Sequence, residues 1–314
     1  MKLLASAVVR GDRQDADLAG LYLVDLDHQT VDRVAGLEDA AKDWVKRGRE
    51  LGFRGIAIDG ERIYCMASDE LFAFGPDFTL LGSWRNPYLK FCRGVAVFGR
   101  KLFIASSGFD SIVGFDLDAQ HFDWALQILT QGFETGAHPF DPNSDDGPIM
   151  LGKLDIRDVY CDTSGMYVTA ERGMIRFSGK HINTAVELPP GSHNARPYRD
   201  GVLFNDSLAG ELRYAGRGEG EEDRAMPVPH YYDVLHRDHC KDALANAGFA
   251  RGLCQLSATT VAGGSSPAAI SVHDLAGNQT LLSVRLSPDA RSSIHSIAIY
   301  DPASRTVAGN SSTM

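Results

Sequence analysis

The chain has 314 residues, 44% of them hydrophobic, and a formal net charge of −10 at pH 7. This composition fits a soluble globular protein with a sizeable core. The acidic balance argues against a general nucleic-acid binder, which should be basic, and no stretch approaches the roughly 20 apolar residues of a membrane span. We therefore expect neither nucleic acid nor membrane as a partner.

The N-terminal segment MKLLASAVVRGD contains a short apolar run, residues 3–9. It resembles a secretion signal only in part, and it also resembles later segments such as KLFIASS, so we interpret it as a strand. The five cysteines lack the CxxC pairing that is typical of metal sites. They are predicted to be reduced core residues of an intracellular protein. A cytoplasmic location is expected.

A sequence phrase recurs six times: a polar residue, a small residue, a hydrophobic run, a turn and a second hydrophobic run. It begins at Arg54, Arg93, Arg157, His193, Arg251 and His295. The shorter intervals are about 40 residues, which is the length of a four-stranded blade in a repeat architecture. We predict that the two hydrophobic runs form strands a and b of a blade, joined by tight turns such as Asp59-Gly60, and that strands c and d follow.

The two chain ends complement each other. The last unit supplies strands a and b, and segments 20–27 and 29–36 have the pattern of strands c and d. Joining them in one blade leaves no sheet edge open. The place of segment 2–9 stays open, because it competes with 305–309 for the strand b position. The sequence thus predicts a single all-β domain over 1–314, a six-bladed β-propeller whose last blade is closed by N- and C-terminal strands. A β-sandwich is the alternative.

Three enlarged connections precede a strand a. They are residues 131–154, residues 227–249 and the stretch EDAAKDWVKRGRELGF before Arg54. Function concentrates on loops carried by a rigid scaffold. We expect short helical insertions on one face of the propeller, forming a lid over the channel mouth.

The first residues of the six strands a should form a ring near the propeller axis. Converging guanidinium groups repel one another and are costly to desolvate without a partner, whereas a carboxylate, sulfate or phosphate matches the arginine fork. An anionic small molecule is therefore the expected ligand. The predicted binding residues are Arg54, Arg93, Arg157, Arg251, Asn194, Asn205 and Tyr198. Alternatively, the arginines pack between blades or pair with neighbouring carboxylates.

The phrases RGIAID and RGVAVF resemble NHL repeats, and the six-blade plan is similar to the superfamily of gluconolactonase-like, strictosidine-synthase-like and phosphotriesterase-like propellers. The segment HNARPYRDGVLFND, followed by GFARGL, resembles an uncharacterised family of bacterial propeller proteins. The resemblance covers nearly the whole chain, but a shared fold is weak evidence for a shared function. Gluconolactonase-like enzymes hold a divalent metal with Asn, Asp and Glu. This chain has Arg or His instead, so a calcium site of about six oxygens is not apparent.

A second route to a metal runs through histidine. NHL-type amidating lyases, which the chain resembles in its repeat only, use channel histidines on zinc, and this makes His193 and His295 candidate ligands. A catalytic site normally needs three protein ligands. In PHYYDVLHRDHCKD a helix would place His236 and His239 on one face. A divalent transition metal (zinc, iron or manganese) is one hypothesis, and ordinary polar or packing roles are the other.

Carboxylates stand at the ends of the predicted strands b. Glu171 or Asp206, beside His193 or His295, could act as a general base, or could neutralise a channel arginine. Two functions remain open. One is an enzyme of the lyase, isomerase or hydrolase type acting on an anionic small molecule. The other is a non-catalytic propeller that binds a small anion or a protein partner, and a homo-oligomer is compatible with both.

Overall fold

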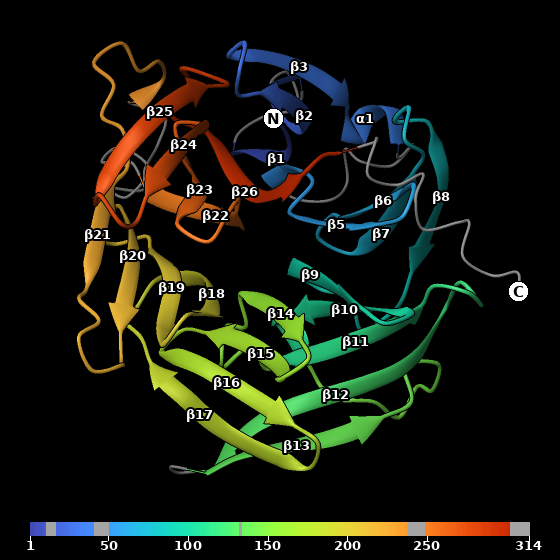
Figure 1. Cartoon of the computed structure of the whole chain (residues 1–314). Coiled ribbons are helices and arrows are strands. Elements are labelled where there is room, and N and C mark those ends of the chain that lie inside the picture. Colours follow the sequence, from blue (N-terminus) through green and yellow to red (C-terminus); the bar gives the residue numbers. More distant parts are fainter. Residues whose placement is uncertain (11–16, 41–49, 132–133, 238–248, 302–314) are drawn as a thin grey trace, which may run out of the picture.

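The computed structural model describes residues 1–10, 17–40, 50–131, 134–237 and 249–301. These residues form six antiparallel sheets arranged in a ring (Figure 1). The innermost strands contact one another in the order β5, β9, β14, β18, β22 and β26, and β26 returns to β5. The predicted six-bladed β-propeller is confirmed.

Each sheet is one blade, and in blades 1 to 5 the strands follow one another along the chain. Blade 1 contains β5 (Gly55–Asp59), β6 (Arg62–Met66), β7 (Glu70–Phe74) and β8 (Leu80–Arg85). Blade 2 contains β9 (Cys92–Phe98), β10 (Lys101–Ser106), β11 (Ser111–Asp116), β12 (His121–Gln131) and β13 (Glu134–Phe140). Blade 3 contains β14 (Asp158–Asp162), β15 (Gly165–Ala170), β16 (Gly173–Ser178) and β17 (His181–Glu187).

The second half of the ring repeats the plan. Blade 4 contains β18 (Ser192–Tyr198), β19 (Gly201–Asp206), β20 (Glu211–Gly216) and β21 (Arg224–Pro227). Blade 5 contains β22 (Phe249–Gln255), β23 (Thr260–Ser266), β24 (Ala269–Asp274) and β25 (Gln279–Arg285). Blade 6 contains β26 (Ser292–Ile299), β1 (Lys2–Arg10), β2 (Gly20–Asp25) and β3 (Thr30–Ala35), and β4 (Glu50–Gly52) pairs with the end of β1.

The turns between the first two strands of blades 1 and 2 explain why the phrase carries a glycine there. Gly60 and Gly99 have φ values of +55° and +60°, a left-handed conformation that glycine adopts without steric cost. Such turns match the twist of the strands they join. Local turn chemistry thus fixes these two hairpins.

Blade 6 closes the ring, with one difference from the prediction. β2 and β3 take the third and fourth positions as expected, and β1 occupies the second, paired with β26 through Leu3 and Ile299. The C-terminal part therefore contributes the innermost strand, while the N-terminal part contributes the other three. The competing segment 305–309 lies outside the described residues.

The connection 131–154 differs from the predicted lid. Its first part forms β13, which pairs along β12 as a fifth, outermost strand, because an exposed strand edge offers free hydrogen-bonding groups. In the connection 227–249, Asp233 pairs with Arg285 of β25 at 2.5 Å. The described helical turns are α1 (Leu37–Ala40) and the 3-10 turn Ser107–Phe109. The remaining predicted insertions, 41–49 and 238–248, lie outside the described residues.

The core consists of apolar layers between neighbouring blades, as expected for sheets packed face to face. Between blades 1 and 2, for example, Tyr64 and Leu71 pack with Ile104 and Phe115, all of them buried. Across the described ranges, no helix has the length and apolar character needed to cross a bilayer.

Candidate functional site

The six residues that open the repeated phrase stand at the start of the innermost strands, around the axis of the ring. Arg54, His193 and His295 are almost completely buried, with exposed fractions of 7%, 6% and 6%. Because equivalent strands of a propeller run in the same direction, the six side chains gather at one end of the channel. We call these six residues the basic ring.

Arg251 links two histidines of the basic ring. Its Nη1 lies 3.0 Å from Nε2 of His295, and its Nη2 lies 3.0 Å from Nε2 of His193. A guanidinium can only donate, so both Nε2 atoms accept, and both imidazoles are neutral with their proton on Nδ1. Burial, followed by the positive charge of Arg251, lowers the pKa of each histidine well below its usual value.

Arg251 itself has no carboxylate partner within 4.0 Å among the described residues, and its buried Nε makes no hydrogen bond there. Its guanidinium lies over the ring of Phe249, 5.5 Å from the ring centroid. Burial, together with repulsion from Arg93 and Arg10, lowers the pKa of Arg251. A buried charge without a counter-charge is costly, and among the described residues this guanidinium has none.

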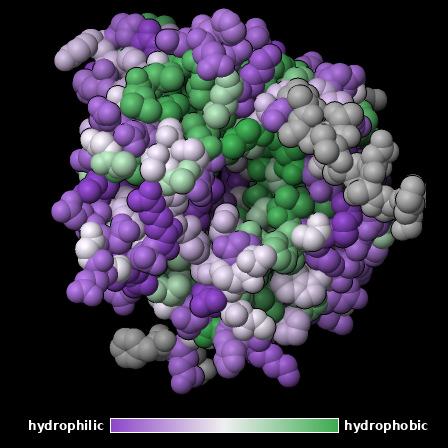
Figure 2. Space-filling model, viewed as in Figure 1, coloured by the Kyte–Doolittle hydropathy of each residue, from purple (hydrophilic) through white to green (hydrophobic). Residues whose placement is uncertain are grey.

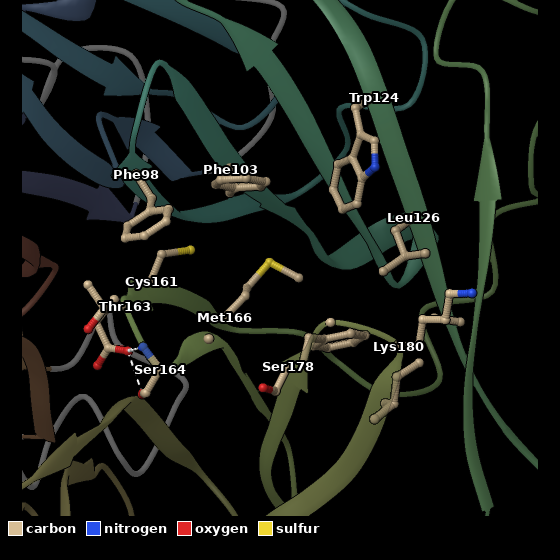
Figure 3. A pocket seen from close by; sticks show the side chains of 16 residues that line it. Phe98, Phe103, Trp124, Leu126, Cys161, Thr163, Ser164, Met166, Ser178 and Lys180 are labelled. Atoms are coloured by element: carbon tan, nitrogen blue, oxygen red, sulfur yellow. Dashed lines mark hydrogen bonds between the residues drawn. The ribbon is translucent and has the colours of Figure 1, made fainter.

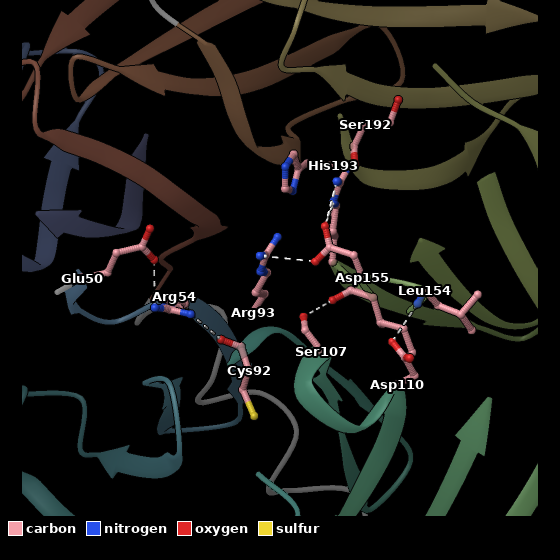
Figure 4. Close-up of polar contacts among 12 residues, drawn as sticks. Glu50, Arg54, Cys92, Arg93, Ser107, Asp110, Leu154, Asp155, Ser192 and His193 are labelled. Atoms are coloured by element: carbon pink, nitrogen blue, oxygen red, sulfur yellow. Dashed lines mark hydrogen bonds and ion pairs between the residues drawn. The ribbon is translucent and has the colours of Figure 1, made fainter. Parts of the chain in front are cut away.

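The other arginines of the basic ring are paired (Figure 4). Arg54 Nη2 contacts Glu50 Oε2 at 2.9 Å. Asp155 serves two arginines: Arg157 Nη2 lies 2.8 Å from its Oδ2, and Arg93 Nη2 lies 3.3 Å from its Oδ1. The alternative that ring arginines pair with carboxylates is therefore realised at these three positions and not at Arg251.

Three contributors to this site were missed by sequence reasoning. Glu50 pairs with Arg54 and also with Arg10, whose Nε lies 3.5 Å from Glu50 Oε1. Burial would raise the pKa of Glu50, but Arg54 and Arg10 outweigh it and keep that pKa below its usual value. Asp155 precedes Arg157 by two residues, and this proximity was the available signal. Glu50 and Arg10 come together only through the pairing of β4 with β1.

Asn194 and Asn205 form a hydrogen-bonded layer next to the basic ring. Asn194 Oδ1 accepts from Asn205 Nδ2 at 3.0 Å and from the Gly252 amide at 2.8 Å. Asn194 Nδ2 donates to Asp158 Oδ2 at 2.9 Å. The Oδ1 atom of Asn205 is buried and unpaired among the described residues. The contacts that these amides make are therefore with the scaffold.

The structure does not bring the other predicted residues to the basic ring. Tyr198 lies at the opposite end of β18 from His193, and its hydroxyl donates to the Ala258 carbonyl. Asp206 pairs with Arg213 at 3.2 Å, and Glu171 is exposed. Sequence reasoning placed these side chains by strand ends alone, without the direction in which each one points.

The histidines proposed as metal ligands have other partners wherever the structure describes them. His236 Nδ1 lies 2.9 Å from Asp289 Oδ2, whereas His193 and His295 direct Nε2 to Arg251. His239 lies outside the described residues. Within the ranges that the structure describes, no group of three or more His, Cys, Asp or Glu side chains is arranged to hold a metal ion. A metal on His193 and His295 would have to displace a guanidinium.

A separate pocket of about 600 Å³ opens between blades 2 and 3 (Figure 3). Its lining is mostly aromatic and aliphatic, including Phe98, Phe103, Trp124 and Met166, and Lys180 is its cationic residue. It contains no member of the basic ring. The arginines and histidines of the basic ring lie in the channel and not in this pocket.

Comparisons with known proteins support the fold. No family model matches the chain, and no curated protein matches it. A chain of a crystal structure of a nidogen/laminin complex superposes with a TM-score of 0.59 at 11% identity, covering 96% of this chain and 99% of that chain. The WD40 β-propeller domain of Doa1 gives 0.42 at 12% identity, covering 74% and 68%. BamB from Moraxella catarrhalis gives 0.39 at 14% identity, covering 74% of each chain.

At 11% identity, the superposition on the nidogen/laminin chain is evidence for the fold alone. The superpositions on Doa1 and BamB, with TM-scores below 0.5, are too weak to support any conclusion. The class of protein is defined by its own structure: a six-bladed β-propeller with a basic ring at one end of the channel.

Proposed function

We propose that this propeller binds a small anion at the basic ring. The observation that carries the proposal is Arg251, a partly buried guanidinium with no carboxylate partner among the described residues and an unpaired Nε. A carboxylate, sulfate or phosphate group would supply both the missing charge and the missing acceptor. The ligand class is a compact anion with several oxygen acceptors.

The neighbouring charges support the same ligand. Arg93 repels Arg251, and Asp155 is shared between Arg93 and Arg157. A bound anion would relieve this repulsion.

Catalysis on the bound anion is a second proposal, of the lyase, isomerase or hydrolase type. It rests on His193 and His295, whose Nε2 atoms contact Arg251. If the bound anion took over the Arg251 donors, a neutral imidazole could accept a substrate proton at Nε2. Membership in the NHL and gluconolactonase-like superfamily belongs to this proposal as well. In a test for turnover, His193→Gln should abolish product formation while an unreactive anion still binds.

The anion proposal is tested by isothermal titration calorimetry with phosphate, sulfate, malonate and citrate on the full chain. Arg251→Met should weaken the best binder at least about a hundredfold, the scale of a lost charge-assisted pair. Arg100→Gln is the matched control, because Arg100 pairs on the surface with Asp59 and Asp118 and its loss changes the net charge equally. Equal affinities for Arg251→Met and the wild-type protein would refute the proposal.

A further inference from the structure

The channel holds a second cavity, of about 340 Å³, lined by residues of all six innermost strands. Its wall is largely aliphatic and includes Ile56, Ile58, Val95, Val97, Leu253 and Ile297. Figure 2 shows a hollow near the centre of this face, with hydrophobic side chains above it and to its right. The volume lies in the range of small-molecule sites. This cavity contains none of the basic ring residues.

Two opposite charges line this cavity without pairing with each other. Asp158 is 9% exposed, and Arg196 is half-buried. Burial raises the pKa of Asp158, and the nearby charge of Arg196 offsets only part of that effect. Yet no ion pair within 4.0 Å joins them or links either one to another described residue.

Each of the two groups is fixed in place by the scaffold. Asn194 Nδ2 donates to Asp158 Oδ2 at 2.9 Å. Arg196 Nη2 donates to the Leu253 carbonyl at 2.9 Å, and its guanidinium lies 5.3 Å from the centroid of the Tyr160 ring. The Nε atom of Arg196 is buried and has no acceptor among the described residues. The cavity therefore presents a held carboxyl, a held guanidinium and aliphatic walls.

We propose that this cavity is a second binding site, for a small zwitterion with an apolar substituent, of the α-amino acid class. The ligand carboxylate binds Arg196, the ligand ammonium binds Asp158, and the aliphatic side chain packs on the wall. An uncharged apolar molecule would leave both protein charges unpaired, at a desolvation cost. A ligand with one charge would leave one of them unpaired.

The site is independent of the anion site proposed above. Asn194, Asn205 and Gly252 form the hydrogen-bonded layer next to the basic ring. Asn194 also lines the cavity, together with Asp158, the first residue of β14, whereas no residue of the basic ring does. Variants at Arg196 should therefore leave anion binding unchanged, and Arg251→Met should leave amino-acid binding unchanged.

Calorimetry on the full chain with three matched probes tests the ligand class. L-Leucine should bind, while 4-methylpentanoate, which lacks the ammonium, and 3-methylbutylamine, which lacks the carboxylate, should bind at least about tenfold more weakly. If L-leucine and L-phenylalanine both fail to bind up to about 10 mM, the limit of weak binding, the proposal is overturned. Equal binding of L-leucine and either truncated probe also overturns it.

Variants locate the site. Asp158→Asn keeps the oxygen that accepts from Asn194, and it should weaken L-leucine at least about tenfold, as should Arg196→Gln. Arg217→Gln is the control, because Arg217 is exposed and donates to the Ala185 carbonyl. Wild-type affinity for L-leucine in both variants contradicts the assignment.

Discussion

Arg251 is the residue on which the functional account depends. It donates to two neutral histidines, and these can neutralise none of its charge. The three other arginines of the basic ring have carboxylates. The protein thus keeps one guanidinium uncompensated, at a cost in stability, as binding sites often do.

Arg251→Met should make the ligand-free protein more stable, by about 1 kcal/mol or more, because it removes a poorly solvated charge. It also relieves repulsion with Arg93 and Arg10. The measurement is the free energy of unfolding from urea titration in buffer free of polyvalent anions. Arg100→Gln, an exposed position, should change it by less than about 1 kcal/mol. A loss of stability in Arg251→Met would indicate a purely structural role.

The buried histidines predict how stability depends on pH. His193 and His295 have pKa values well below the usual 6.5 in the folded protein, and burial lowers the pKa of His273 to about 4. Above pH 6.5 these groups are neutral in both states. As the pH falls below 6.5, the unfolded chain binds protons that the folded protein cannot, so stability decreases.

Each histidine inside its window contributes a slope of about 1.4 kcal/mol per pH unit. Unfolding free energies from urea titrations between pH 7.5 and 5.5 should therefore fall only below about pH 6.5. His273→Gln should reduce the slope by the contribution of one histidine. The histidines would be accessible to protons in the folded state if stability stayed constant over this range.

At the scale of elements, the strand β1 carries the closure of the ring. It pairs with β26 on one side and β2 on the other, and its side chains from Leu3 to Val9 are all buried. Loss of its packing would open the ring at the one blade that is assembled from both chain ends.

Leu4→Ala in β1 should lower the free energy of unfolding by about 2–5 kcal/mol, the cost of a cavity in a packed core. The matched control is Leu81→Ala in β8, where leucine is 57% exposed, and its effect should stay within about 0.5 kcal/mol. Chemical denaturation of the two variants measures the difference. Similar values for both would contradict the role given to β1.

The repeat phrase was sufficient to predict the ring, because glycine turns and alternating strands are local signals and the number of phrases equals the number of blades. It could not place β1, since any apolar strand fits the second position until the pairing of Leu3 with Ile299 is known. It also could not predict β13, which forms by pairing with the edge of β12.

The sequence predicted the site in part, as it did the fold. The six ring positions follow from the phrase, and the structure brings Arg251, His193 and His295 together. Glu50 and Arg10 were missed, because they lie far apart in sequence and meet through the short β4 pairing. The candidates Asp206 and Tyr198 contact Arg213 and the Ala258 carbonyl instead of the ring, because a strand position does not define where its side chain finds a partner.

At the scale of the whole molecule, an acidic protein of net charge −10 carries four arginines of the basic ring at one end of its channel. Low-dielectric walls focus such a local positive field on a small anion, while the acidic exterior disfavours large polyanions. The fold brings the ring side chains together, because the starts of six equivalent strands lie around one axis.

The most direct measurement is a crystal structure grown with selenate, a compact anion that anomalous scattering locates. The account predicts a selenium peak in the basic ring, with selenate oxygens at about 2.7–3.2 Å from the guanidinium of Arg251. The same crystals of Arg251→Met should lose that peak and keep any surface sites. Selenate only at surface arginines such as Arg100, with the basic ring free of it in the wild-type protein, would contradict the account.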